Sequence, residues 1–275
     1  MSTILITGSS KGIGRATALY LDRKGFTVLA GVRSTADGDS LRQEASVRLQ
    51  PIVLDITDAS QIVQAVEQVH HIVGQNGLDG LVNNAGIAVA APLEFMPIDE
   101  SRHQIEVNLT GHLAVTQALL PCIRQTKGRI INISSVGGRI AGPMIGAYHA
   151  SKFAMEALTD SLRQELAPWQ IQVVSIEPGA IATPIWETSL STADRLLAQM
   201  PLTGREYYAG AIDQARASAQ RNAKNGLSPD RVARVIEQAL TARQPKTRYA
   251  VGIDAHIGTR ILAHLLDRVR DWLLR

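Results

Sequence analysis

The amino-acid sequence predicts an α/β protein with a doubly wound parallel sheet of about seven strands and helices on both faces. Short β-branched runs alternate with segments of helical period through the first two thirds of the chain, as in successive β-α-β units. The runs are largely apolar along their length, for example Thr3 to Thr7 and Thr27 to Val32. Strands of a parallel sheet are buried on both faces and show this continuous pattern.

Seven segments qualify as strands, and helices are expected between them. From 184 to 228 the alternation stops, and two helices are expected, at about Ser191 to Gln199 and Tyr207 to Asn225. Ligands of open parallel sheets bind beyond the carboxyl ends of the strands. We therefore expect a helical lobe at 184–228 that covers this crevice, within one domain of residues 1–275. The expected strands are Thr3 to Thr7, Thr27 to Val32, Pro51 to Leu54, Gly80 to Val82, Arg129 to Ile133, Ile171 to Ile176 and Arg248 to Val251.

Composition narrows the class of protein and of partner. The 275 residues are 45% hydrophobic and 19% charged, as in ordinary globular proteins. Cys122 is the only cysteine, which excludes an intrachain disulfide and fits a reducing, cytoplasmic setting. The net charge is 28 − 25 = +3, and no aromatic residues interleave with an arginine cluster, so nucleic acid is not expected as a partner. The sequence offers no metal-ligand pattern, no signal peptide and no apolar run long enough to span a membrane.

A glycine-rich turn joins the first strand to a helix expected at Arg15 to Lys24. Glycines at such a turn allow a tight bend and let a pyrophosphate approach the backbone. The helix N-terminus adds unpaired N–H groups and the positive end of a dipole. Within a β-α-β unit this pattern favours a dinucleotide site over a plain turn. The residues concerned are Gly8, Ser10, Lys11, Gly12, Ile13 and Gly14.

The second strand ends without the carboxylate that usually binds the ribose 2′-hydroxyl of NAD. Arg33 stands there instead, and its guanidinium suits a 2′-phosphate. Lys11 adds a second cation from the glycine turn. These side chains favour NADP(H) over NAD(H) as the cofactor. The alternative is that both are ordinary solvated cations.

Three polar side chains are expected to converge at the carboxyl end of the fifth strand. Tyr148 and Lys152 are four residues apart at the start of an expected helix, so they project from one face. Ser135 lies thirteen residues before Tyr148 and directly follows a buried strand. Taken singly, each has an ordinary structural alternative, such as a turn cap for Ser135.

These motifs resemble those of the short-chain dehydrogenase/reductase family over about Thr3 to Thr183. The family's glycine motif matches Thr7 to Gly14, and its Asn-Asn-Ala-Gly motif matches Asn83 to Gly86. The resemblance implies a Rossmann-type fold, homodimers or homotetramers, and a bound nicotinamide cofactor. It implies that the catalytic residues are Asn108, Ser135, Tyr148 and Lys152. It implies cofactor contacts at Gly8, Ser10, Lys11, Gly12, Ile13, Gly14, Arg33, Asp55, Ile56, Asn83, Ala85, Gly86, Tyr148, Lys152, Pro178, Gly179, Ile181 and Thr183.

The chemistry of carbonyl reduction requires a hydride from the cofactor and a proton from an acid. Tyr148 is the candidate acid, and we expect the Lys152 ammonium and an oxidised nicotinamide to lower its pKa from the ordinary value of about 10. By resemblance, Lys152 also binds the ribose, Ser135 orients the substrate oxygen and Asn108 holds a relay water. Two assignments stay open. Asp55 could be the N-cap of the next helix, and Asn83 could join neighbouring strands instead of touching the cofactor.

The segment around Tyr148 looks like that of 17β-hydroxysteroid and retinol dehydrogenases, which suggests a bulky apolar alcohol or carbonyl. The apolar wall would be formed by residues 142–145 together with Ile185 and Trp186. Residues 257–275 read as one amphipathic helix, which would pack on the protein or a partner subunit, or would lie on an anionic membrane. Two alternative functions are a regulator that senses the cofactor without turnover, and a nucleotide-sugar epimerase or dehydratase.

Overall fold

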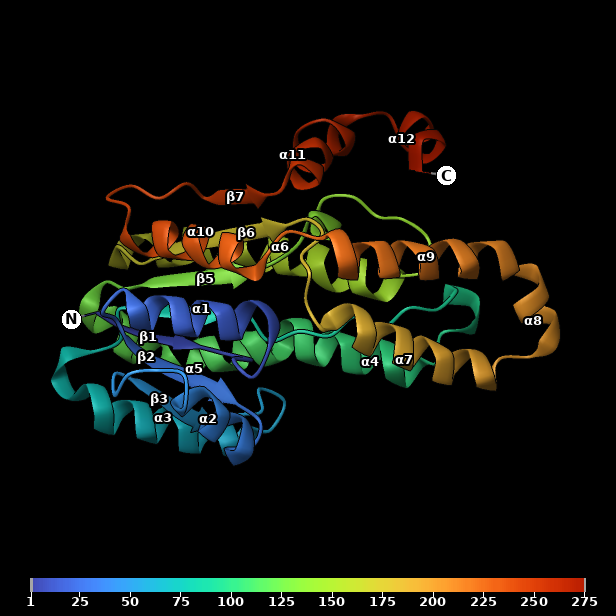
Figure 1. Ribbon diagram of the computed structural model, residues 1–275. Helices are drawn as coiled ribbons and strands as arrows, with labels where there is room; N and C mark the ends of the chain where they lie inside the picture. The colour runs from blue at the N-terminus through green and yellow to red at the C-terminus, as the bar shows by residue number, and fades with distance from the viewer. Residues whose placement is uncertain (1, 275) are drawn as a thin grey trace.

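The computed structural model describes residues 2–274 and contains a seven-stranded sheet that is parallel throughout (Figure 1). The strands lie in the order β3-β2-β1-β4-β5-β6-β7. Successive strands are added outward from β1 on one side up to β3, and from β4 onward they are added on the other side of β1. This doubly wound, Rossmann-type arrangement confirms the predicted fold class. The strands are β1 (Thr3–Ile6), β2 (Thr27–Val32), β3 (Leu49–Val53), β4 (Gly80–Asn83), β5 (Arg129–Ile133), β6 (Gln172–Pro178) and β7 (Arg248–Val251).

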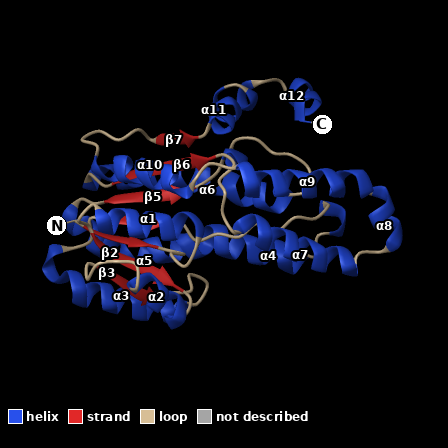
Figure 2. Cartoon of the chain, in the orientation of Figure 1, coloured by secondary structure: helices blue, strands red, loops and turns tan. Residues whose placement is uncertain are grey.

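Helices cover both faces of the sheet (Figure 2). One face packs against α1 (Gly12–Arg23), α2 (Thr35–Arg42) and α10 (Pro229–Thr241). The other packs against α3 (Ala59–Val73), α5 (Gly111–Thr126) and α6 (Gly146–Leu166). Alternate residues of each strand serve the two layers: Ile4 and Ile6 of β1 face the α1 side, whereas Leu5 faces α3 and α5.

Strand positions agree with the sequence analysis to within two residues at either end. The largest differences are at β3, which starts at Leu49 rather than Pro51, and at β6, which runs on to Pro178. Boundaries of this kind depend on ladder hydrogen bonds to neighbouring strands, which a single segment does not reveal.

The lobe predicted at 184–228 consists of α7 (Ile185–Gln199), α8 (Leu202–Tyr207) and α9 (Ala209–Asn225), which extend beyond the carboxyl ends of the strands in Figure 1. The first helix begins six residues earlier than predicted, and the second predicted helix agrees with α9 to within two residues. The short helix α8, which ends where the chain turns at Tyr208, was not predicted. The lobe is tied to the α4 region (Ile98–Ile105) by a hydrogen bond from the Tyr208 hydroxyl to Glu94 (2.9 Å) and an ion pair between Arg195 and Glu100 (2.5 Å).

The prediction of a single helix at 257–275 is wrong. The described residues form α11 (Ile253–Arg260), a short turn at Leu262–His264 and α12 (Asp267–Leu274). The buried face of α11 ends at Thr259, and helices this short depend on packing for their stability, so the helical period alone does not sustain one long helix. Arg275, the last residue of the predicted helix, lies outside the described residues. Among residues 2–274, no helix is both long and apolar enough to cross a bilayer.

Candidate active site

The glycine turn between β1 and α1 forms a backbone cradle. Gly8 and Gly12 adopt left-handed conformations, with φ of +66° and +61°. A Cβ at Gly8 would lie 2.8 Å from the Ala85 backbone, and one at Gly14 would overlap the Gly8 carbonyl. Lys11, the N-cap of α1, makes no side-chain cap, so the first amides of α1 stay available to an anion. These features fit a dinucleotide.

The segment after β4 is pinned against this cradle. The Thr7 hydroxyl accepts hydrogen bonds from the amides of Asn84 (2.9 Å) and Ala85 (3.0 Å). The Asn84 side chain donates to the carbonyls of Thr7 and Gly8 at 2.9 and 3.1 Å. Asn84 lies inside the recognised motif but was not among the predicted contact residues. It holds Gly86, which is exposed, beside the glycine turn.

The structure shows the local contacts of Asn83 and Asp55, the two residues whose assignments were left open. The Asn83 side chain is buried inside the sheet and donates to Thr116 and to Asn132, both at 2.9 Å, so it joins β4 to β5 and α5. Asp55 is not a helix cap, since Asp58 caps α3. The Asp55 carboxylate instead binds the amide and hydroxyl of the residue two positions on.

The two candidate cations, Lys11 and Arg33, lie beyond the carboxyl ends of β1 and β2. Arg33 follows β2 and is exposed, and no carboxylate among residues 2–274 pairs with it. Lys11 is also exposed and contacts the Thr188 hydroxyl of α7 at 3.4 Å. Of the other predicted contact residues, Ser10 lies in the glycine turn, Ile13 at the start of α1 and Ile56 just beyond β3.

Asn108 occupies a π-helical turn, Glu106–Thr110, between α4 and α5. Its side chain accepts a hydrogen bond from the Ile87 amide (2.9 Å) and donates to the Ile87 carbonyl (3.0 Å) and the Ser151 hydroxyl (3.0 Å). Such turns recur at functional sites because they redirect a helix locally. Asn108 thereby links the segment after β4 to α6.

Ser135, Tyr148 and Lys152 meet at the carboxyl end of β5. The Ser135 hydroxyl accepts from the Gly137 amide (3.0 Å), so this residue is also a turn cap, and it lies close enough to Tyr148 to influence the pKa of the phenol. The Lys152 Nζ lies 5.8 Å from the centroid of the Tyr148 ring and donates to the Ile133 carbonyl at 2.8 Å. A phenol, a hydroxyl and an ammonium group therefore surround one spot.

Burial governs the charges at this spot. It raises the pKa of Tyr148 above the ordinary value, although the Ser135 side chain acts in the opposite direction. The expected lowering by Lys152 is thus not found in the protein alone: desolvation of the phenolate dominates, and the opposing influence comes from Ser135. Burial also lowers the pKa of Lys152 to about 8, against the influence of the Glu156 carboxylate. At neutral pH Tyr148 holds its proton and Lys152 is mostly charged.

His112 also belongs to this region, although no sequence motif pointed to it. It lies one turn after Asn108, and its Nε2 is 2.7 Å from the Ala85 carbonyl. Burial, helped by the charge of Lys152, lowers the pKa of His112 to about 3. The ring is therefore neutral, and Nε2 carries the proton that it donates to Ala85.

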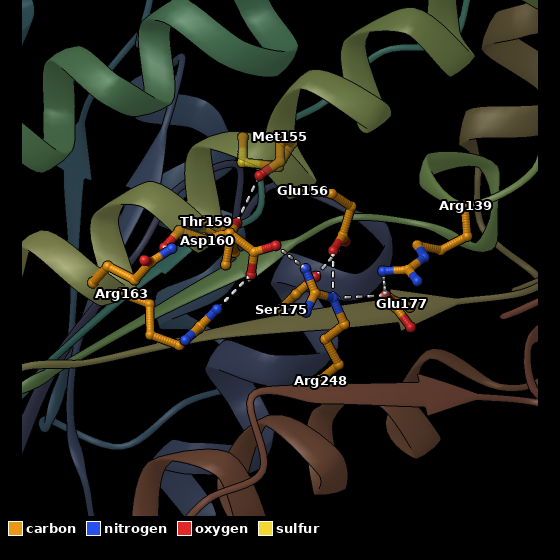
Figure 3. A network of polar contacts seen from close by, with 11 residues as sticks. Arg139, Met155, Glu156, Thr159, Asp160, Arg163, Ser175, Glu177 and Arg248 are labelled. Atoms are coloured by element: carbon orange, nitrogen blue, oxygen red, sulfur yellow. Dashed lines mark hydrogen bonds and ion pairs between the residues drawn. The ribbon is translucent and has the colours of Figure 1, made fainter. Parts of the chain in front are cut away.

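A buried ion-pair network lies behind these residues (Figure 3). Glu156 of α6 accepts hydrogen bonds from the Ser175 hydroxyl (2.5 Å) and from Arg248 Nε (2.9 Å). Arg248 of β7 also pairs with Asp160 (2.7 Å) and Glu177 (3.4 Å). Burial and the neighbouring Glu156 raise the pKa of Glu177 to about 7. The network ties α6, β6 and β7 together.

The loop after β6 completes the site. It starts at Pro178 and Gly179, passes the buried Ile181 and reaches Thr183, which lies against the glycine turn. A Cβ at Gly12 would be 3.4 Å from the Thr183 side chain. The loop therefore borders the same cradle as the turn between β1 and α1.

Comparisons with known proteins agree with this geometry. A family model described as short chain dehydrogenase matches residues 2–194. The chain is 41% identical to retinol dehydrogenase 5 of Mus musculus, over 98% of this chain and 88% of that protein. It is 36% identical to an NADPH-dependent 3-dehydrocapnine reductase of Ornithobacterium rhinotracheale, over 98% and 95%. The crystal structure of a short-chain dehydrogenase from Streptomyces avermitilis aligns with a TM-score of 0.79 at 29% identity, covering 99% of this chain and 94% of that one.

The matches extend over nearly the whole chain, and the matched family model ends within α7, so it contains all four candidate catalytic residues. A 17-beta-hydroxysteroid dehydrogenase type 6 is also among the relatives. The chain is therefore an oxidoreductase of the short-chain dehydrogenase family, in the branch of retinol and steroid dehydrogenases.

Proposed function

We propose that the chain is an NADP(H)-dependent oxidoreductase that interconverts a ketone or aldehyde and its alcohol on a bulky apolar substrate. The observation that carries the proposal is the meeting of Ser135, Tyr148 and Lys152 beside the glycine cradle. Ser135 follows β5, whereas Tyr148 and Lys152 lie on α6, so the meeting of the serine with the other two is a property of the fold.

In this proposal Tyr148 gives its proton to the substrate oxygen during reduction. Its raised pKa keeps the phenol protonated at neutral pH, as an acid requires. Ser135, whose side chain acts on the pKa of Tyr148, holds the same oxygen. Lys152 stabilises the phenolate that is left, and Asn108 positions the relay water. The bound nicotinamide supplies or accepts the hydride.

The preference for NADP(H) rests on Arg33. An exposed guanidinium without a carboxylate partner among the described residues suits a 2′-phosphate. The similarity to a reductase named as NADPH-dependent supports the same choice.

An apolar substrate is supported by the start of α7. Ile185 and Trp186 are partly exposed there, and Trp186 Nε1 donates to the Ile181 carbonyl at 2.7 Å, which fixes the indole beside the cofactor loop. Named relatives act on retinol or hydroxysteroids. We propose a steroid-, retinoid- or lipid-like alcohol or carbonyl as the substrate.

Assembly and location complete the proposal. Residues 1–275 act as one domain, in a homodimer or homotetramer. The single buried thiol of Cys122 supports a cytoplasmic setting. The exposed apolar side chains of α12 support peripheral contact with a membrane that holds such substrates.

The test is NADPH consumption, with NADH in parallel, over a panel of steroids, retinoids, fatty aldehydes and small ketones. Tyr148→Phe should abolish turnover and still bind NADPH, because it removes only the proton donor. Tyr20→Phe is the matched control. It also removes one tyrosine hydroxyl, but that hydroxyl bonds Glu237 on α10 and is not one of the candidate catalytic groups.

Other outcomes would favour the alternative functions. Tight NADPH binding without turnover on any substrate would favour a regulator. Purification with a nicotinamide that does not exchange, together with activity on nucleotide sugars, would favour an epimerase or dehydratase.

A further inference from the structure

The loop after β6, residues 178–183, is held in part by a side chain from a helix distant in sequence. Several of its backbone groups bond to other backbone groups: the Gly179 amide donates to the Val251 carbonyl (3.0 Å), and the Ala180 carbonyl accepts from the Leu227 amide (2.9 Å). The Ala180 amide instead donates to a side chain, the carboxylate of Asp254, at 2.6 Å. Asp254 lies in the first turn of α11, far along the chain from this loop.

The same carboxylate occupies the space beside Gly179. A Cβ at position 179 would overlap both oxygens of Asp254, so only glycine fits there while the carboxylate keeps its place. Because the Asp254 side chain is short, it could make room only by giving up its bond to Ala180. The glycine and the carboxylate therefore form one contact.

The other end of α11 touches the turn that follows Ser135. Gly258 packs so closely against Val136 that a Cβ there would overlap the valine side chain, and Ile140 lies nearby. One short helix thus contacts both the turn after β5 and the loop after β6. The Ser135 hydroxyl and the Pro178 carbonyl approach to 3.5 Å between these two segments.

We propose that Asp254 is a positioning residue for the nicotinamide cofactor: it holds the loop 178–183 in its binding shape by fixing the Ala180 amide. A loop already ordered before binding loses less conformational freedom when the cofactor arrives, and affinity rises accordingly. This inference rests on the proposed function, since it assigns the loop to the cofactor.

The experiment measures two properties of wild type, Asp254→Ala and Asp254→Asn. Hydrogen exchange of the cofactor-free protein reports the opening of the loop 178–183, and fluorescence titration gives the dissociation constant for NADPH. Asp267→Ala is the matched control, because Asp267 is an exposed carboxylate of α12 that pairs with Arg270.

We expect Asp254→Ala to speed exchange in the loop and to weaken NADPH binding by about tenfold, since a charged acceptor of a backbone amide is lost. Asp254→Asn keeps an acceptor oxygen and should restore most of the affinity. The melting temperature should hardly change, because Asp254 is exposed. Unchanged loop exchange, or unchanged NADPH affinity, in Asp254→Ala would overturn the inference.

A second variant tests the contact from the other side. Gly179→Ala should speed loop exchange as Asp254→Ala does, and the double variant should be no faster than either single one, because both changes break one contact. Rates that multiply in the double variant would contradict the shared contact. If wild type binds neither NADPH nor NADH, the proposed function fails instead, which the titration of wild type reveals before any variant is compared.

Discussion

Lys152 is a charged side chain kept where water hardly reaches it. Only 5% of its surface is exposed, and burial lowers its pKa from 10.5 to about 8. The folded protein therefore disfavours the protonated lysine at pH 7, and its stability should rise as the pH increases from 8 to 10.5, where the unfolded chain binds more protons. A charge that destabilises the fold is retained at the point where the proposed chemistry needs it.

Lys152→Met should abolish turnover and stabilise the protein at pH 7. Each pKa unit corresponds to about 1.4 kcal/mol, and allowing for the lost bond to Ile133 we expect a gain of about 2 kcal/mol. Urea unfolding measures it, and the gain should vanish above about pH 10.5, where lysine is neutral in both states. Lys224→Met, at an exposed position, is the control. A less stable Lys152→Met protein at pH 7 would contradict this account.

Arg33→Asp should reverse the cofactor preference. The new carboxylate repels a 2′-phosphate and can accept hydrogen bonds from a 2′-hydroxyl, so NADPH should bind at least about tenfold more weakly while NADH improves. Dissociation constants for both nucleotides measure the effect. Arg243→Asp, an exposed change before β7, should alter neither. If Arg33→Asp leaves the ratio of the two constants unchanged, the role assigned to Arg33 is wrong.

Residue types and spacing predicted the meeting of Ser135 with Tyr148, because a strand end and a helix start define where side chains go. They could not separate Asn83 from Asn84, adjacent residues of one type. Strand pairing decides that the first points into the sheet and the second toward the cradle. His112 and Asp254 carried no signal, since their partners are backbone groups distant in sequence.

Among the elements, β7 depends on one side chain for its attachment to α6. Arg248 forms ion pairs with Glu156, Asp160 and Glu177, and two of these carboxylates are almost fully buried. Removing the arginine would leave them uncompensated in a poorly solvated place, which is more costly than losing an exposed pair.

Arg248→Met should therefore destabilise the protein by about 3–5 kcal/mol at pH 8. The loss should be smaller at pH 5.5, because Glu177, whose pKa is about 7, is then protonated and needs no partner. Denaturant unfolding at the two pH values measures both effects. Arg102→Met breaks an exposed pair with Asp99 and should change little. Equal losses at the two pH values would refute the assigned role of Glu177.

Helical period predicted the long packed helices well and the terminal ones poorly. The helix containing Tyr148 and Lys152 is fixed by a buried face along its length. Around α11 and α12 the period continues, but the packing surface ends at Thr259. The extent of α11 depends on its packing against the turn after Ser135, and the residues of the segment alone do not reveal that packing.

For the whole molecule, α12 presents apolar side chains outward from the fold. Trp272 is 73% exposed and Leu273 50%. A chain ending at Arg260 keeps α11 and its contacts, so it should retain its melting temperature and NADPH affinity but lose sedimentation with anionic vesicles. Undiminished sedimentation of the shortened chain would remove the membrane proposal.

The packing of α1 on α10 has a consequence for how the chain folds as it is made. The Tyr20 hydroxyl bonds Glu237, 217 residues later, and the two helices cover the same face of the sheet. Until the ribosome has produced α10, the apolar surface beside α1 has no partner, although the cofactor cradle is already synthesised. Such distant contacts slow folding and leave intermediates that expose apolar surface and are prone to aggregate. The nascent chain should therefore be a client of chaperones until its last strand is released.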